Sequence, residues 1–112
     1  MANTISLIVY PAKEPAKTKS IFSTFLGAEP YVDSPYYAGY KLDNLEVGLD
    51  PHGKEVICYI DVADIRSSLK ALTDAGGVVR QEIRNVGGGL LVATVSDASG
   101  NTLGLRGREQ PR

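Results

Sequence analysis

The 112-residue sequence has one cysteine, Cys58, one histidine, His52, and no tryptophan. A single cysteine excludes an intrachain disulfide, and one cysteine with one histidine is too few for a His-rich or Cys-rich metal cluster. The chemistry left to the chain is that of carboxylates, tyrosines, hydroxyls and the backbone, or binding without catalysis.

The sequence also lacks a charge excess and long apolar runs. Its 12 Lys and Arg balance 13 Asp and Glu, which argues against a nucleic-acid partner because such proteins cluster basic residues. The longest apolar runs, 56–60 and 90–95, are a third or less of the ~20 residues that a membrane-spanning helix needs. The first four residues do not resemble a secretory signal. We therefore expect a cytoplasmic protein with no membrane partner.

The length favours a homodimer. A domain of this size typically buries somewhat over 60% of the surface of its unfolded chain, which leaves little material to enclose a ligand alone. A second subunit would supply the missing wall of a binding site.

The chain contains the same order of signals twice. Each half begins with an apolar strand, continues with an amphipathic helix that ends near glycine, and closes with three short strands. The opening strands, 5–10 and 56–62, are rich in β-branched and aromatic residues. The pattern predicts one domain over 1–112, built from a βαβββ module at 4–50 and a second at 55–107.

The helix ends are marked by residues that favour them. Pro15 suits the first turn of the first helix, and Gly27 suits its C-terminal stop. Asp61 or Asp64 can cap the second helix, which Gly76 ends. The apolar stripes recur at helical spacing, with Ile21, Phe22, Phe25 and Leu26 in the first helix and Ile65, Leu69, Leu72 and Ala75 in the second.

After each helix the apolar period changes from 3.6 to about two, which is typical of strands. Turn residues separate each pair of segments. The predicted strands are 29–33, 36–42 and 45–50 in the first half, and 78–86, 90–96 and 102–106 in the second.

Three segments resemble a known family. They are Phe-x-x-Phe-Leu-Gly at 22–27, Val-Ala-Asp-Ile at 62–65 and Asp-Ala-Ser-Gly-Asn at 97–101. In this order on a tandem βαβββ repeat, they resemble the vicinal oxygen chelate superfamily, which includes glyoxalase I, extradiol dioxygenases, and fosfomycin and bleomycin resistance proteins. The resemblance covers residues 4–107. It implies an α+β fold with curled mixed sheets around a cavity and helices on the convex face.

Strand alternation assigns side chains to the helix side or the cavity side of this expected fold. We expect the helix side to hold Leu7, Val9, Val47, Leu49, Cys58, Ile60, Val62, Leu103 and Leu105. We expect the cavity side to hold Ser6, Ile8, Tyr10, Glu46, Gly48, Asp50, Ile57, Tyr59, Asp61, Gly104 and Arg106.

The resemblance also identifies where a metal would bind. Relatives place His, Glu or Gln ligands on concave positions of the first, fourth, fifth and eighth strands, which here are Ser6, Gly48, Ile57 and Gly104. A shift of two residues brings in Glu46, Asp50 or Arg106, which adds no imidazole and at most two nearby carboxylates. We therefore expect no metal ligands and no cofactor.

Three further features have a structural and a functional interpretation. His52 is favoured as an exposed turn residue over a general base, because no partner lies near it in the sequence. Cys58 is favoured as a small buried hydrophobe over a nucleophile. The glycines at 87–89 are favoured as a flexible hairpin turn over a phosphate-binding loop, because no Lys-Ser/Thr follows them.

Tyrosine is enriched, with six residues against two phenylalanines. Tyrosine has an apolar body and a polar tip, which suits both a half-wet cavity and an exposed strand at a sheet edge. In the functional interpretation, tyrosines stack on a flat ligand while charged groups lie at the cavity mouth, with Asp61 among them. The predicted ligand-binding residues are Ser6, Tyr10, Tyr40, Asp50, Ile57, Tyr59 and Arg106.

The leading hypothesis is a metal-independent protein that binds or sequesters a small apolar or aromatic compound, as bleomycin-resistance relatives do between two subunits. Bleomycin itself is disfavoured, because a net charge of −1 gives a weak field for a cationic drug. The alternative is a glyoxalase-type or dioxygenase-type lyase or isomerase with an atypical metal or a carboxylate site that uses Glu46, Asp50 or Tyr59. A third hypothesis is a purely structural or regulatory dimer with a closed, filled cavity.

Overall fold

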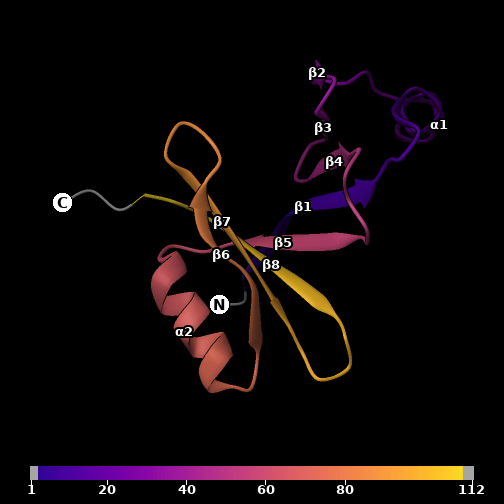
Figure 1. Cartoon of the computed structure of the whole chain (residues 1–112). Coiled ribbons are helices and arrows are strands. Elements are labelled where there is room, and N and C mark those ends of the chain that lie inside the picture. Colours follow the sequence, from indigo (N-terminus) through magenta and orange to yellow (C-terminus); the bar gives the residue numbers. More distant parts are fainter. Residues whose placement is uncertain (1–2, 110–112) are drawn as a thin grey trace. The chain divides into compact units, whose positions relative to one another are not determined.

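The computed structural model describes residues 3–109 and has a tandem βαβββ order, which confirms the α+β fold class (Figure 1). The elements are β1 (Thr4–Pro11), α1 (Pro15–Leu26), β2 (Val32–Ser34), β3 (Tyr37–Lys41), β4 (Glu46–Asp50), β5 (Ile57–Asp61), α2 (Ile65–Asp74), β6 (Val78–Asn85), β7 (Leu90–Ser96) and β8 (Thr102–Arg108). No helix within 3–109 is both long and apolar enough to cross a membrane.

The chain forms two compact units, and we describe each by itself. The first unit is Ser6–Ile57. Among the described residues, the second unit consists of 58–109 and 3–5. Each unit contains one helix, packed on one face of its strands.

The strands of the first unit lie in the order β2-β3-β4-β1. β1 is parallel to β4, and β2, β3 and β4 are successively antiparallel. The helix side of this sheet holds the buried core of the unit. The buried members are Ala12, Ala38, Tyr40, Val47 and Leu49, and Tyr10, Phe22, Leu26, Ala28 and Leu42 pack against them.

Helix α1 begins and ends where the sequence predicts. Pro15 occupies the first turn, and Gly27 ends the helix with φ 65°, a left-handed conformation that glycine adopts without strain. Its apolar stripe is narrower than predicted. Phe22 packs on the core, whereas Ile21 is 67% exposed and Phe25 is 77% exposed. At about 100° per residue, positions 21 and 25 lie outside the arc that faces the sheet.

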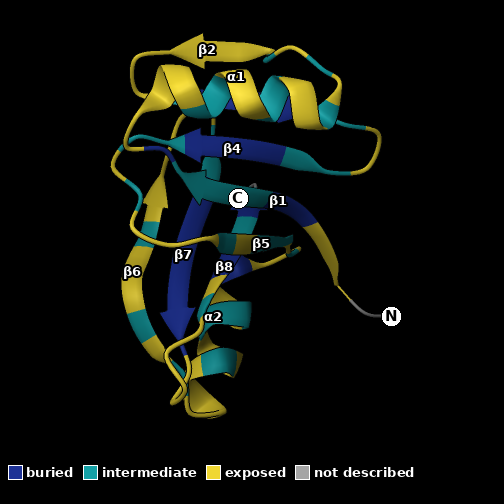
Figure 2. Ribbon diagram, turned by 90° about the vertical axis from the view of Figure 1, so that its right-hand side faces the viewer, coloured by how far each residue is buried: buried dark blue, intermediate teal, exposed yellow. Residues whose placement is uncertain are grey.

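The strands of the second unit lie in the order β5-β8-β7-β6. β5 is parallel to β8, and β8, β7 and β6 are successively antiparallel. Strand β7 is buried along most of its length (Figure 2). The core on the helix side consists of Ile65, Leu91, Ala93 and Leu105, with Ile60, Val62, Leu69, Leu72 and Ile83 packed against them.

Asp64 caps helix α2, as one of the two predicted candidates. Its carboxylate accepts hydrogen bonds from the backbone N–H of Arg66 at 3.1 Å and of Ser67 at 3.2 Å, which satisfies two of the helix's first free donors. The helix ends at Asp74, and Ala75, the last residue of the predicted stripe, is exposed. Gly76 follows with φ 109°.

Strand ends differ modestly from the predictions. The predicted strand 29–33 is reduced to Val32–Ser34, although the Tyr31 N–H still donates to the Gly39 carbonyl at 2.8 Å. The glycines at 87–89 join β6 to β7 with φ angles of 121°, 62° and 80°. Positive φ angles are strained for residues with a side chain, so three of them in succession explain why this turn consists of glycine.

The face prediction for β1 is wrong. The Tyr10 ring lies 4.9 Å from the Phe22 ring of α1, and Tyr10 pairs with Leu49, a helix-side residue. Ile8 and Tyr10 are therefore on the helix side, and Leu7 and Val9 are on the other side. The error comes from aligning the two opening strands one residue out of phase, which exchanges the faces of every side chain.

Candidate functional site

Each sheet has one face covered by its helix and one turned away from it, which we call the helix-distal face. Cross-strand pairing identifies the residues on it. In the first unit they include Val9, Tyr37, Gly39, Lys41, Glu46 and Gly48. In the second unit they include Tyr59, Asp61, Gln81, Arg84, Val92, Thr94, Ser96, Gly104 and Arg106.

Tyr37 lies across two paired glycines on the helix-distal face of the first unit. Gly39 of β3 is opposite Gly48 of β4. A methyl group at Gly48 would overlap the Tyr37 hydroxyl, and one at Gly39 would contact the same ring at 3.2 Å. The missing side chains therefore let the ring lie close to the backbone.

Tyr31 extends this aromatic surface and contacts two charged residues of the same face, Glu46 and Lys41. A methyl group at Gly39 would touch its ring at 3.3 Å. The Tyr31 hydroxyl donates a short hydrogen bond of 2.5 Å to the Glu46 carboxylate, and the Lys41 ammonium lies 5.0 Å from the ring centroid. This distance is suitable for a cation–π interaction.

The second unit repeats the pairing of tyrosine with glycine. Tyr59 of β5 is opposite Gly104 of β8, and a methyl group at Gly104 would overlap the Tyr59 ring. Gly104 is buried and Tyr59 is half-buried. Each unit thus places a tyrosine ring over a glycine of its last strand, β4 or β8, on the helix-distal face.

Arg106 and Asp61 lie beside this second pair. They are opposite each other on β8 and β5, and the Arg106 Nε donates to the Asp61 carboxylate at 3.0 Å. The Arg106 side chain is 14% exposed, whereas that of Asp61 is 57% exposed. The pair presents charge on the same face as the Tyr59 ring.

Three of the seven predicted ligand-binding residues are on the wrong face. Tyr10 packs on Phe22, and Ser6 shares its face by alternation. Tyr40 is completely buried beneath α1, where its hydroxyl bonds the Ser23 hydroxyl at 2.8 Å and donates to the Lys19 carbonyl at 3.1 Å. Their predicted placement on the cavity side is corrected accordingly.

The other four predicted ligand-binding residues lie on the helix-distal face, as expected. Tyr59 and Arg106 lie on the helix-distal face, and Ile57 shares it by alternation. Asp50 also belongs to it, but its carboxylate accepts the His52 N–H at 2.9 Å and so holds the turn after β4. His52 is exposed in that turn.

Cys58 does not have the predicted environment. It is exposed, although Ile60, two residues later on the same face, packs in the core. Its partner on β8, Leu103, is 43% exposed. The expectation of a buried hydrophobe is therefore wrong, because the packed core ends one residue pair short of this position.

Sequence reasoning missed Tyr31 and Tyr37 as site residues. The dense group of tyrosines between positions 31 and 40 was the signal for them. Alternation alone could not select among them, because the ring of Tyr37 extends from the end of β3 over the neighbouring strand. The pairing of Gly39 with Gly48 is what selects Tyr37 among these tyrosines, because its ring lies over both glycines.

Two of the four strand positions where the resemblance implies metal ligands, Gly48 and Gly104, have no side chain. With the corrected phase of β1, Val9 pairs with Gly48 and Tyr59 pairs with Gly104. A ligand side chain at either glycine would occupy space that a tyrosine ring fills. Within residues 3–109, no three His, Cys, Asp or Glu residues lie close enough to share a metal ion.

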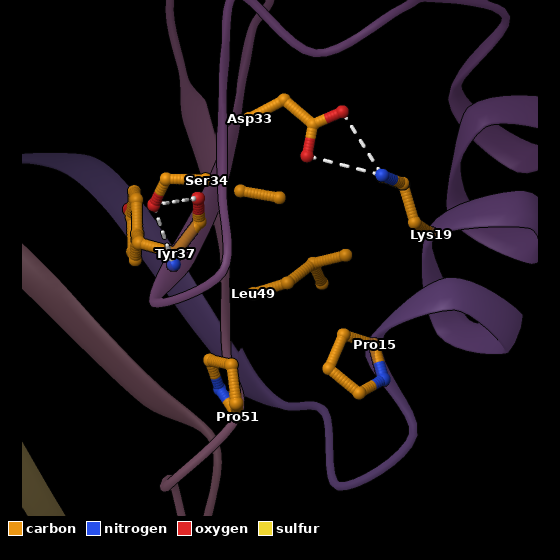
Figure 3. Close-up of a pocket in the computed structure, with 8 residues that line it drawn as sticks. Pro15, Lys19, Asp33, Ser34, Tyr37, Leu49 and Pro51 are labelled. Atoms are coloured by element: carbon orange, nitrogen blue, oxygen red, sulfur yellow. Dashed lines mark hydrogen bonds and ion pairs between the residues drawn. The ribbon is translucent and has the colours of Figure 1, made fainter.

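One small cavity lies on the helix side of the first unit, between α1 and the strand ends (Figure 3). Its volume is about 40 Å³, room for a few water molecules rather than a ligand. Lys19 and Asp33 close it with an ion pair of 2.9 Å, and the Tyr37 ring points to the opposite side of its strand. The cavity therefore does not contribute to the helix-distal face.

Two carboxylates outside the site have altered titration. The Ser67 backbone and hydroxyl hydrogen bonds hold the pKa of Asp64 below its ordinary value. Hydrogen bonds from the Asn101 side chain and backbone do the same to the pKa of Asp97. Both groups cap local structure, one at the start of α2 and the other in the turn before β8.

No protein-family model matches the chain, and no curated protein matches it. Solved structures match over nearly the whole chain. One is a glyoxalase/bleomycin resistance protein/dioxygenase superfamily member from Vibrio splendidus 12B01, with a TM-score of 0.73 and 17% identity, covering 96% of this chain and 99% of that chain.

Two further matches are epimerases. Methylmalonyl-CoA epimerase from Streptomyces coelicolor, in complex with 2-nitronate-propionyl-CoA, matches with a TM-score of 0.76 and 14% identity, covering 99% of this chain and 100% of that chain. Methylmalonyl-CoA epimerase from Mycobacterium tuberculosis matches with a TM-score of 0.69 and 12% identity, covering 96% of this chain and 88% of that chain. The chain therefore has the vicinal oxygen chelate fold, as its sequence resemblance implied.

Proposed function

We propose that the protein binds a small, flat, largely apolar or aromatic compound on its helix-distal faces, without a protein-bound metal. The observation that carries this proposal is the tyrosine ring over a glycine in both units, Tyr37 over Gly48 and Tyr59 over Gly104. Both rings are half-buried, so each leaves part of its surface accessible.

A tyrosine ring that lies close to the backbone and is only half-buried is a suitable platform for another ring. Aromatic pairs contribute about 0.5–1.5 kcal/mol beyond the area that they bury. A ring that already rests on glycine has lost most of its rotational freedom before the ligand arrives, which lowers the entropic cost of binding. The same contact also stabilises the sheet itself, so binding must be measured directly.

Metal-dependent chemistry is not part of the proposal, because the donor set does not fit it. The strand positions at which the resemblance implies metal ligands carry Ser6, Gly48, Ile57 and Gly104. None of these side chains is a ligand that a divalent metal prefers.

We further propose a homodimer. Ile21 and Phe25, one turn apart on α1, are 67% and 77% exposed. We propose that two copies meet through these two exposed apolar side chains. A cytoplasmic location and the absence of a nucleic-acid partner remain predictions.

A second candidate function is metal-free proton transfer by Glu46. The observation that favours it is the 2.5 Å hydrogen bond from the Tyr31 hydroxyl to the Glu46 carboxylate, which couples an acid to a base on an accessible face. If Glu46 transfers protons, Glu46→Gln and Tyr31→Phe would each abolish turnover of a substrate that the wild type deprotonates. Binding without turnover would leave the first proposal standing.

The test of binding uses a neutral probe, naphthalene-1-acetamide, measured by isothermal titration calorimetry. We expect saturable binding that Tyr37→Ala or Tyr59→Ala weakens at least fivefold, with Tyr36→Ala as the matched control because Tyr36 is 76% exposed in a turn. Equal affinity in all three variants would overturn the proposal. Stoichiometric metal in the purified protein, with loss of binding after chelation, would also overturn it.

A further inference from the structure

The helix-distal face of the second unit carries two guanidinium groups in one cross-strand row. Val92 of β7 is paired with Arg106 of β8 on one side and with Arg84 of β6 on the other. Asp61 completes the row on β5. The row therefore holds two positive charges and one negative charge.

Arg84 and Arg106 can reach the same point above Val92. Neighbouring strands are roughly 4.8 Å apart, so the two arginine backbones are separated by roughly 10 Å. Each side chain extends far enough to span half of this distance. Val92 is 9% exposed and forms a short apolar floor between them.

The two arginines differ in their partners. Arg106 bonds Asp61 through Nε and is largely buried. The Arg84 side chain is exposed, and within the described part of the chain it makes no hydrogen bond or ion pair. The exposed Arg84 guanidinium lies next to the Arg106 guanidinium, which Asp61 holds in place. This arrangement favours binding of an anion from outside the chain.

The adjacent row supplies the rest of a site. Gly104 and Tyr59 lie one row along from Arg106 and Asp61, at a spacing of roughly 7 Å along the strand. Thr94 lies on the same row, paired with Gly104 and Gln81. An aromatic ring bearing a carboxylate matches this arrangement, with the anion at the arginines and the ring beside Tyr59.

We propose that the second unit binds aromatic carboxylates, with Arg84 and Arg106 holding the carboxylate over Val92 and Tyr59 holding the ring. This inference rests on the proposed binding function and specifies its ligand class. Arg84 is then the specificity-determining residue, because it distinguishes an anion from a neutral isostere. Arg106 is positioned by Asp61, which orients its guanidinium before the ligand binds.

The test compares two probes of nearly the same shape, naphthalene-1-acetate and naphthalene-1-acetamide, by calorimetry at low and high salt. We expect the carboxylate to bind at least tenfold more tightly than the amide, with the preference falling as salt rises. Arg84→Gln should weaken binding of the carboxylate at least tenfold and so remove the preference. Arg84→Lys should retain part of it, because the charge remains without the planar fork.

Arg66→Gln is the matched control, because it removes the same charge from α2, on the other side of the sheet. It should leave the preference intact. Equal affinity of the wild type for both probes would overturn this inference while the binding function stood. Failure of both probes to bind would overturn the binding function itself. Equal loss in the Arg84 and Arg66 variants would also overturn the inference, since net charge alone would then explain it.

Discussion

The hydroxyl of Tyr40 forms a 2.8 Å hydrogen bond with the hydroxyl of Ser23, which joins β3 to α1 inside the first unit. The same tyrosine oxygen donates to the Lys19 carbonyl at 3.1 Å. A buried tyrosine with both bonds made has a structural role, and Tyr40 lies on the helix side rather than on the predicted cavity side.

Removing this hydroxyl should destabilise the fold without affecting binding. Tyr40→Phe leaves a half-buried hydroxyl and a carbonyl without their partner, at a cost of about 1 kcal/mol. Urea denaturation measures the change in the free energy of unfolding. Tyr36→Phe is the control and should change nothing, because Tyr36 is 76% exposed. No loss of stability in Tyr40→Phe would show that the bonds are unimportant in solution.

The contact between Tyr59 and Gly104 should appear as energetic coupling. Gly104→Ala places a methyl group in the space of the Tyr59 ring and should cost about 1–3 kcal/mol of stability. In a Tyr59→Ala background the same change should cost much less, since the ring is gone. A double-mutant cycle measures this difference. Additive effects within about 0.5 kcal/mol would contradict the contact.

Acid should destabilise the protein partly through Asp97. Its pKa is lowered in the folded chain by the Asn101 hydrogen bonds, so folding favours the charged form. The stabilisation is complete above the ordinary value of 3.8 and is lost as the pH falls through the lower, folded-state pKa. Asp97→Asn should flatten the stability profile below pH 3.8. Urea denaturation at each pH measures the free energy of unfolding, and Asp43→Asn, at another exposed aspartate, is the control.

Dimerisation through α1 should depend on Phe25. Phe25→Ser removes the most exposed ring of the helix and should shift sedimentation at micromolar concentration toward the 12.0 kDa monomer. The free energy of unfolding of the monomer should hardly change, because this ring buries little surface within the chain. A wild-type monomer at these concentrations would refute the dimer.

The order of elements was predictable because each one carries local signals. Pro15 and Gly27 frame α1, Asp64 caps α2, and the change from a period of 3.6 to two marks the strands. These signals depend on neighbours in the sequence. They therefore identify helices and strands without knowledge of tertiary contacts.

The site was only partly predictable, because it depends on phase and on cross-strand neighbours. A shift of one residue in β1 exchanged Tyr10 with Val9, since strand faces alternate at every position. The pairing of Gly39 with Gly48, which receives the Tyr37 ring, arises from register between strands. No periodicity within one segment encodes such a pair.

The packing of a ring on a glycine also constrains how this sequence can change. A histidine or glutamate introduced alone at position 48 or 104 would meet Tyr37 or Tyr59 before it could reach a metal ion. Each substitution requires the ring to move aside or to be replaced by a smaller side chain. A change at either glycine is therefore coupled to the tyrosine that lies over it, and replacing both residues of a pair removes the overlap that the single substitution creates.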